Sequence, residues 1–347
     1  MSTSTYEPYV PENGIRMIAE WERQDRVFMG WPTSVETCLN EANEHMFQDL
    51  RSDVAGMANA IIEFEPVVML TDPEQITSAQ EMLDARVTIV PFDFFDLWAR
   101  DMLPVFVEKI DSDGKKTLVG VDFNFNGYGN KTECKKNAHL SSKLLEMYGI
   151  PKRPAHIISE GGALITDGRG TLFITDSCIV NENRNKQTKA EIERELKRVL
   201  GMRKIIWLEG VAGKDYTDGH VDCLVRYAAP GTVLLNCSFE GSTPDHWTRS
   251  NLAAEEVLKT ATDADGTREV FVPCYTNFLI GNGFVLIPKF GDEESDLEAV
   301  RVVSSAFPGR KVISTGLSAL ACLGGGVHCF TKEQPEYHRG TIEEFVD

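Results

Sequence analysis

Short apolar strands alternate with amphipathic helices along all 347 residues, and this alternation restricts the chain to an α/β fold. Several strands occur in pairs across short turns that contain glycine, such as residues 167–170 and 230–231, which is typical of hairpins. Each hairpin is followed by a helix and a further strand, whereas a plain parallel sheet needs no hairpins. No low-complexity linker divides the chain, so we expect a single domain, residues 1–347, of repeated mixed β/α units.

The patterning defines the expected elements. Strands are predicted at residues 27–31, 67–71, 87–92, 104–110, 117–123, 163–166, 171–175, 204–208, 223–228, 232–236, 269–273, 278–280, 284–288 and 311–314. Helices are predicted at residues 44–63, 74–83, 138–148, 189–200, 245–261 and 292–307. The clearest is 189–200, because Thr188 can cap its start, Glu191 completes a capping box and Gly201 can end it.

Charge and cysteine usage narrow the function classes. With 35 basic and 53 acidic residues the net charge is −18, which argues against nucleic-acid partners and is compatible with a cationic ligand. No run of 18 apolar residues is present, so we expect no membrane partner. The eight cysteines form no C-x-x-C pair and no zinc-type spacing, and residues 1–9 do not read as a secretory signal. We therefore expect a cytoplasmic protein with reduced thiols and no metal.

Four short stretches place reactive polar groups beside glycine or aromatic residues: 96–101 (DLWARD), 160–162 (EGG), 217–222 (TDGHVD) and 324–329 (GGGVHC). Asp101, Glu160, His220 and Cys329 follow one another at intervals of 59, 60 and 109 residues. If each repeated unit contributes one loop to a common central face, these groups converge there.

Each stretch also has a purely structural interpretation. His220 and Asp222 are two positions apart, so on a strand they point the same way, either as a general acid beside a carboxylate or as a solvated pair at a strand edge. Asp101 can form a local ion pair with the preceding arginine, and Glu160 can lie in a surface turn. The glycines at 324–326 lack the phosphate-loop pattern and either allow close backbone approach or form a flexible turn beside a buried thiol.

The combination favours one chemistry. Three carboxylates beside a thiol and an imidazole would repel the oxyanion intermediate that forms from a neutral acyl substrate. They suit a guanidinium, whose fork of N–H donors matches paired carboxylates. Attack of a thiolate on the electrophilic guanidinium carbon is deimination.

At these residues the chain resembles the agmatine deiminases, within the superfamily of guanidino-group-modifying enzymes that includes bacterial-type peptidyl-arginine deiminases. The resemblance runs from about residue 14 to residue 335. It implies an α/β fold, a five-bladed α/β propeller (pentein) of ββαβ-type repeats around a central active site. Besides the four stretches, it includes residues 16–17, 19–22, 29–32, 125–127, 183–185, 277–278 and 288–292.

The resemblance also implies roles for five residues and no metal or organic cofactor. Asp101 and Asp222 would clamp the guanidinium, and Cys329 would attack its carbon. His220 would act as general acid and base, while Glu160 would bind a remaining N–H or support His220.

The substrate tail is where the chain departs from the family pattern. Members commonly carry an acidic residue four positions before the catalytic histidine, where this chain has Tyr216, with Asp215 adjacent. We expect substrate contacts from Trp98, which can make a cation–π contact, and from Asp96, Asp215, Tyr216 and Gly326.

The expected partner is a small cationic guanidine, agmatine, converted to N-carbamoylputrescine and ammonia. A peptidyl-arginine or free-arginine deiminase, an amidinotransferase and a non-catalytic guanidine-binding protein remain as alternatives. A homo-oligomer is compatible with the sequence, which does not define the oligomeric state.

Overall fold

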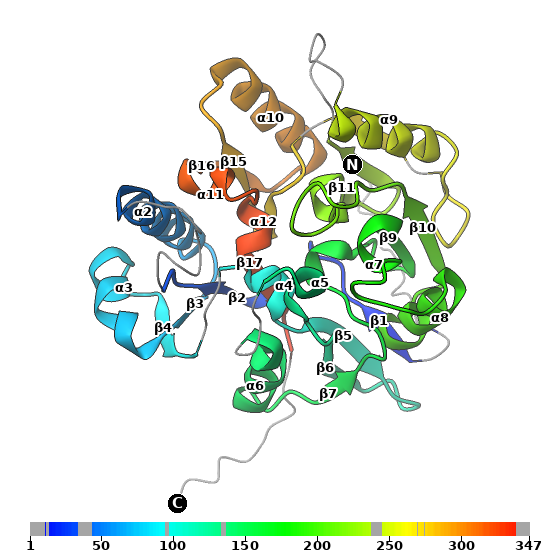
Figure 1. Ribbon diagram of the computed structural model, residues 1–347, viewed down its shortest axis with the longest axis horizontal. Coiled ribbons are helices and arrows are strands. Elements are labelled where there is room, and N and C mark those ends of the chain that lie inside the picture. The colour runs from blue at the N-terminus through cyan, green and yellow to red at the C-terminus, as the bar shows by residue number, and fades with distance from the viewer. Residues whose placement is uncertain are drawn as a thin grey trace, which may run out of the picture.

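The chain has the mixed α/β fold that the patterning predicts. A computed structural model describes residues 11, 14–33, 44–93, 97–132, 137–236, 245–268, 270–273 and 275–337. Within these ranges the strands form five separate sheets of three or four strands, and none of these sheets closes on itself. Figure 1 shows the five sheets with their helices arranged around a middle occupied by α4 and α12.

One unit of the fold shows how each sheet is built. Strands β5 (Val105–Ile110) and β6 (Lys116–Asp122) form an antiparallel hairpin. Helix α6 (Leu140–Met147) then leads back to β7 (Lys152–Pro154), which is parallel to β6. In this sheet the short strand β1 (Ile15–Met17) pairs with the outer edge of β5.

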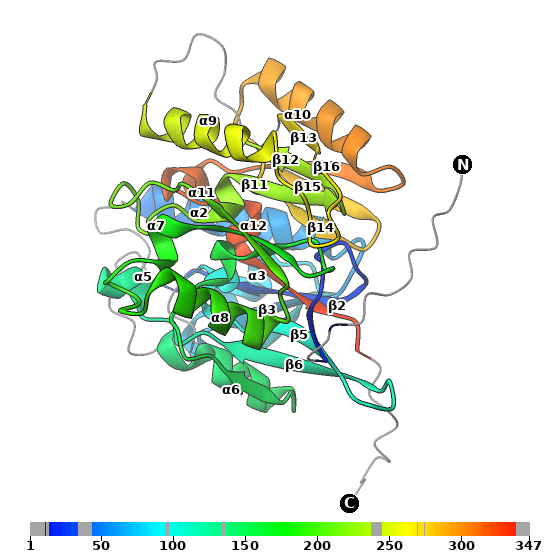
Figure 2. The same cartoon turned by 90° about the vertical axis from the view of Figure 1, so that its right-hand side faces the viewer.

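The same order of hairpin, helix and parallel strand recurs in the next three sheets. In the perpendicular view, α9 and α10 lie at one end of the molecule and α6 at the other (Figure 2). The elements are β8 (Ile165–Thr166), β9 (Thr171–Thr175), α8 (Lys189–Leu200) and β10 (Lys204–Leu208); β11 (Val225–Ala229), β12 (Thr232–Leu235), α9 (His246–Leu258) and β13 (Val270–Pro273); and β14 (Leu279–Gly281), β15 (Phe284–Lys289), α10 (Glu293–Ala306) and β16 (Lys311–Gly316).

The fifth sheet joins the two ends of the described chain. Strand β17 (Thr331–Pro335) pairs antiparallel with β2 (Gln24–Gly30), which is followed by α2 (Glu44–Ile61) and the parallel strand β3 (Val67–Thr71). A 3-10 turn, η1 (Pro73–Gln75), and helix α3 (Ile76–Met82) then lead to β4 (Thr88–Pro91). The hairpin of this sheet is therefore made from segments at opposite ends of the sequence.

The predicted helices are confirmed to within a few residues, and α8 shows why. Thr188 accepts a hydrogen bond from the Glu191 backbone N–H, and the Glu191 carboxylate accepts one from the Thr188 N–H. Gly201 follows with φ of 74°, the left-handed conformation that glycine adopts most readily. Helices α9 and α10 begin in the same way, each with an aspartate side chain, Asp245 or Asp292, as its N-cap.

Several elements differ from the sequence predictions. Strands β1, β7 and β17 were not predicted, and β17 (TKEQP) is polar yet buried at all five positions, so it lacks an apolar signal. Residues 163 and 223, predicted as first residues of strands, instead end the 3-10 turns η3 (Gly161–Ala163) and η4 (Val221–Cys223). The predicted interpretation of His220 and Asp222 as strand neighbours is therefore wrong, because His220 is the N-cap of η4.

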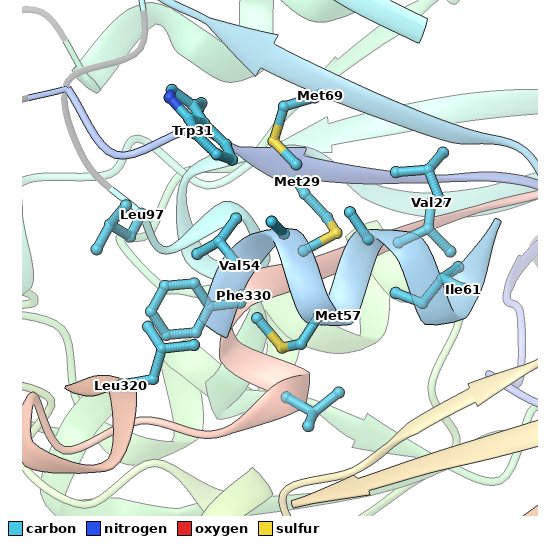
Figure 3. Close-up of a cluster of buried hydrophobic side chains, with 14 of the residues drawn as sticks. Val27, Met29, Trp31, Val54, Met57, Ile61, Met69, Leu97, Leu320 and Phe330 are labelled. Atoms are coloured by element: carbon cyan, nitrogen blue, oxygen red, sulfur yellow. The ribbon is translucent and has the colours of Figure 1, made fainter. Parts of the chain in front are cut away.

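The largest hydrophobic core packs the face of α2 against the fifth sheet and the end of the chain. None of the described helices is long and apolar enough to cross a membrane. Burial of Phe330, which is fully buried next to Cys329, contributes about 2 kcal/mol and holds this part of the chain against the core. Figure 3 shows the cluster of Val54, Met57 and Ile61 from α2, Val27, Met29 and Trp31 around β2, Met69 of β3, and Leu97, Leu320 and Phe330.

Candidate active site

Four one-turn helical segments bring the five predicted catalytic residues together. Asp101 lies in α4 (Ala99–Met102), Glu160 caps η3, His220 and Asp222 belong to η4, and Cys329 lies in α12 (Val327–Phe330). All five residues are at most 6% exposed. Glu160 is therefore not in a surface turn, and His220 with Asp222 is not a solvated pair at a strand edge.

Gly162 marks the point where three of these groups meet. A Cβ atom added to this glycine would lie 2.6 Å from His220 Nδ1, 2.9 Å from Asp101 Oδ1 and 3.0 Å from Asp222 Oδ2. Its backbone N–H donates a 2.9 Å hydrogen bond to Asp101 Oδ1. Among the described residues, His220 Nδ1 and Asp222 Oδ1 have no hydrogen-bond partner although both are buried. Such atoms are the ones that a bound ligand can satisfy.

The His220 imidazole lies between two carboxylates. Its Nδ1 is 3.7 Å from Asp101 Oδ1, and its Nε2 is 3.3 Å from Glu160 Oε2. Burial favours the neutral ring, but Asp101 and Glu160 outweigh it and raise the pKa of His220 to about 10. Burial in turn raises the pKa of Asp101, which His220 partly counteracts. The imidazole is therefore protonated at neutral pH in the free protein.

Glu160 is held by an arginine that the prediction left without a role. Arg184 Nε donates to both carboxylate oxygens of Glu160 at 2.8 and 3.1 Å, and its Nη1 donates to Asp218 at 2.8 Å. Burial opposes ionisation, but the hydrogen bond with His220 and the charge of Arg184 lower the pKa of Glu160. Because Glu160 contacts Nε2 of His220 and is itself held by Arg184, it is placed to support His220.

Asp222 is fully buried and is held by a second histidine. Its Oδ2 lies 2.7 Å from Nδ1 of His328, whose Nε2 lies 2.9 Å from a Glu20 oxygen. Burial would raise the pKa of Asp222, but His328, His220 and Arg226 lower it to about 2. Asp222 is thus an anion with one oxygen, Oδ1, turned away from His328 and available to a cation.

The Cys329 sulfur lies beside this carboxylate. Its Sγ is 3.7 Å from Asp222 Oδ2 and accepts a 3.2 Å hydrogen bond from the Asn277 amide. The other end of the amide, Asn277 Oδ1, accepts from the backbone N–H of His328 at 3.1 Å. Asn277 therefore fixes both the start of α12 and the sulfur that this helix carries.

The glycines before Cys329 allow two close contacts. A Cβ atom on Gly325 would lie 2.0 Å from the Trp98 ring, and one on Gly326 would lie 2.6 Å from Asn277 Oδ1. Trp98 is partly buried and packs on Phe330, with ring centroids 4.6 Å apart. The expectation of close backbone approach is confirmed, and Trp98 lies beside the segment that leads to Cys329.

Arg100 does not pair with Asp101. Its guanidinium makes two hydrogen bonds to Glu333 of β17, at 3.0 and 2.5 Å, and its Nε donates to the His328 carbonyl at 3.3 Å. These contacts join α4 to α12 and β17. The local ion pair offered as a structural reading of Asp101 is therefore wrong, and Arg100 instead links the segments that carry Asp101 and Cys329.

The predicted tail residues are less enclosed. Asp215 is exposed, and its Oδ1 accepts from the Gly219 N–H at 3.1 Å within its own loop, while Tyr216 is 53% exposed. Lys131 donates to the carbonyls of both residues at 3.0 Å and pairs with Asp218 at 2.7 Å. Asp96, the fifth predicted contact, lies outside the described residues.

Sequence reasoning also missed Tyr128, which touches the site. The Tyr128 hydroxyl donates a 3.1 Å hydrogen bond to Asp101 Oδ2, and its ring centroid is 6.3 Å from that of His220. Tyr128 has a left-handed backbone, with φ of 56°, one residue after the motif at 125–127. In the sequence, Tyr128 is only a tyrosine beside a glycine-containing turn, and that pattern does not indicate a role.

The structure also gathers possible metal ligands that are far apart in the sequence. One atom each from Asp222, Cys223 and Cys329 lie within 4.8 Å of one another. The cysteine spacing gave no sign of this group, because Cys329 follows Cys223 by more than a hundred residues.

The chain is similar to known proteins along nearly its whole length. The solved agmatine deiminase of Enterococcus faecalis matches with a TM-score of 0.85 and 24% identity, covering 96% of this chain and 100% of that chain. The molecule therefore has the α/β fold of the deiminases.

An agmatine deiminase of Medicago truncatula is 32% identical, covering 93% of this chain and 97% of that protein. One from Stutzerimonas stutzeri is 32% identical, covering 96% and 99%. Residues 16–335 match the Porphyromonas-type peptidyl-arginine deiminase family, and the chain belongs to this family.

Proposed function

We propose that this chain hydrolyses agmatine to N-carbamoylputrescine and ammonia through a covalent intermediate on Cys329. The observation that carries the proposal is the meeting of His220 Nδ1 with oxygens of Asp101 and Asp222 around Gly162. The Cys329 sulfur is 3.7 Å from the same Asp222 carboxylate. The relatives named agmatine deiminase, at 32% identity over nearly the whole chain, support the choice of substrate.

The two aspartates would hold the guanidinium group. Asp101 is fixed by the Gly162 N–H and the Tyr128 hydroxyl, and Asp222 is fixed by His328. Each then presents carboxylate charge to a planar cation, which would gain charge-assisted hydrogen bonds in a buried site. The guanidinium carbon would be oriented for attack from the side of Cys329.

Deimination would then begin with attack of the Cys329 thiolate on the guanidinium carbon, forming a C–S bond and a tetrahedral intermediate. Collapse of this intermediate would break a C–N bond while His220 donates its proton, so that ammonia leaves. The pKa of about 10 for His220 supports this order, because the free protein holds the proton before the substrate arrives.

Hydrolysis of the amidino-thioether would reverse these roles. The neutral His220 left by the first step would take a proton from water, whose oxygen adds to the same carbon. Breakage of the C–S bond would then release the ureido product and restore the thiolate. Glu160 would stabilise the imidazolium in both steps, since it contacts Nε2 and is itself held by Arg184.

We further propose that the five sheets are the blades of a five-bladed propeller in a single domain. Their shared ββαβ order supports this architecture, as does the pairing of β17 with β2, which completes one sheet from segments at opposite ends of the sequence. The described cysteines, 178, 223, 322 and 329, are free thiols, which supports a reducing, cytoplasmic environment.

The tail of the substrate distinguishes agmatine from arginine. Arginine would bring a carboxylate toward Asp215, and the nearby Lys131 is already paired with Asp218. Even partial burial of an unpaired charge is costly, so agmatine should be preferred by at least about 10³-fold in kcat/KM. Asp215→Asn should narrow this gap by weakening agmatine more than arginine.

The test is a substrate panel of agmatine, free arginine, an arginine-containing peptide and arcaine. Ammonia and ureido product are both measured, with Cys329→Ser as the inactive control. Stoichiometric ammonia without an added amine acceptor would separate hydrolysis from amidino transfer. Tight binding without turnover would indicate a guanidine-binding protein. A preference for the peptide or for free arginine would overturn the proposal.

A further inference from the structure

A second cysteine lies beside the proposed nucleophile. Cys223, the last residue of η4, has its sulfur within 4.8 Å of the Cys329 sulfur. The Asn277 amide donates to both sulfurs, at 3.2 Å to Cys329 and 3.5 Å to Cys223. Cys223 is partly exposed, whereas Cys329 is 6% exposed. The two thiols thus share one donor, and Cys223 is partly open to solvent.

The deimination proposed above does not use Cys223. Its neighbour Asp222 holds the cation and Cys329 supplies the sulfur, so a serine or alanine at 223 would leave every step of that reaction intact. Contact with Cys329, burial and the Asp222 charge raise the pKa of Cys223, which keeps it a neutral thiol beside the nucleophile.

We propose that Cys223 is a resolving cysteine, which captures an oxidised Cys329 as a Cys223–Cys329 disulfide and makes oxidative inactivation reversible. The proposal rests on the proposed function only for the identity of Cys329 as the nucleophile. The oxidant is hydrogen peroxide or a similarly small peroxide, which can enter a site that admits a guanidinium.

Both steps balance. The Cys329 thiolate attacks one peroxide oxygen, the O–O bond breaks, and the second oxygen leaves as water after taking up a proton, which gives a sulfenic acid. The Cys223 sulfur then attacks the Cys329 sulfur and the S–O bond breaks. The hydroxyl leaves with the Cys223 proton as a second water. Overall, two thiols lose two electrons and two protons to one peroxide.

Whether the Cys223–Cys329 disulfide forms before Cys329 is over-oxidised depends on the separation of the two sulfurs. A disulfide needs about 2.05 Å between sulfurs, so side-chain rotation must close the distance. Both side chains lie in one-turn segments, η4 and α12, in which the sulfurs already face the same Asn277 amide. Cys322, seven residues before Cys329, is exposed and donates to the Ser318 carbonyl instead, so it serves as a matched control.

The experiment treats the reduced full chain with increasing hydrogen peroxide in the presence of a chelator. Intact mass, disulfide mapping and activity before and after dithiothreitol are recorded, each variant relative to its own untreated activity. The wild type and Cys322→Ser should lose two hydrogens, yield a Cys223–Cys329 cross-linked peptide and recover activity on reduction. Cys223→Ser should instead gain two or three oxygens on Cys329, with irreversible inactivation at least about tenfold faster.

Two results would overturn the proposal. One is over-oxidation of wild-type Cys329 at the same rate as in Cys223→Ser, and the other is a disulfide that joins Cys329 to a different cysteine. Disulfide mapping requires no turnover, so its result does not depend on whether the proposed substrate is correct. A mapped Cys223–Cys329 bond in a chain that does not deiminate agmatine would refute only the proposed function.

Discussion

Replacement of Gly162 by alanine tests whether the three groups around it form the reacting centre. The new Cβ would lie 2.6 Å from His220 Nδ1, whereas ordinary contact begins at 3.4 Å, so the imidazole must move by about 0.8 Å. Asp101 Oδ1 and Asp222 Oδ2, at 2.9 and 3.0 Å, must move as well. A displacement of about 1 Å in catalytic groups costs on the order of 10²-fold, so kcat/KM should fall about 10²-fold, equivalent to about 2.7 kcal/mol.

The assay is steady-state ammonia release with agmatine, accompanied by thermal unfolding. Gly316→Ala is the matched control, because a Cβ atom there meets nothing within 4 Å. It should keep wild-type activity. If Gly162→Ala is folded and turns over agmatine within about threefold of the wild type, the three groups do not surround the reacting carbon and the reasoning fails.

Three further predictions concern the proposed catalytic groups. Cys329→Ser should lose at least about 10³-fold in turnover while Cys322→Ser stays near wild type, and an active Cys329 variant would exclude the covalent route. His220→Ala mixed with agmatine should accumulate a covalent adduct on Cys329, visible by intact-mass spectrometry; without an adduct, attack itself also requires His220. Because carboxylates raise the pKa of His220 to about 10, the acid is present below that pH, and kcat/KM should fall as pH rises through about 10. If kcat/KM instead falls as pH rises through about 6.5, the ordinary pKa of histidine, the surrounding carboxylates do not raise the pKa of His220.

The regular elements were predictable because their signals are local. Helix α8 carries its start, its capping box and its glycine stop within 14 residues, and the apolar strands at the middle of each sheet are similarly explicit. Strand β17 was not predictable, since Lys332, Glu333 and Gln334 are polar and become buried only when Arg100 and the rest of the chain surround them.

The identities of the candidate catalytic residues were predictable, but their supporting groups were not. The five residues stand in recognisable motifs, whereas each lies in, or directly before, a one-turn helix too short to have a periodic pattern. Asn277, Arg184 and Tyr128 meet the site across at least 24 residues of sequence, through contacts that only the packing of separate sheets creates. Cys223 was likewise one cysteine among eight until the fold placed its sulfur beside Cys329.

The pairing of β17 with β2 has a consequence for synthesis on the ribosome. Asp101, Glu160, His220 and Asp222 all emerge well before Cys329, which lies two residues before the start of β17. A nascent chain can therefore assemble the acidic cluster while it still lacks Cys329. Through the same period β2 has only β3 beside it, and its other edge stays open until the final strand arrives. Synthesis of residues 329–335 thus supplies, almost together, the proposed nucleophile and the strand that covers this exposed edge.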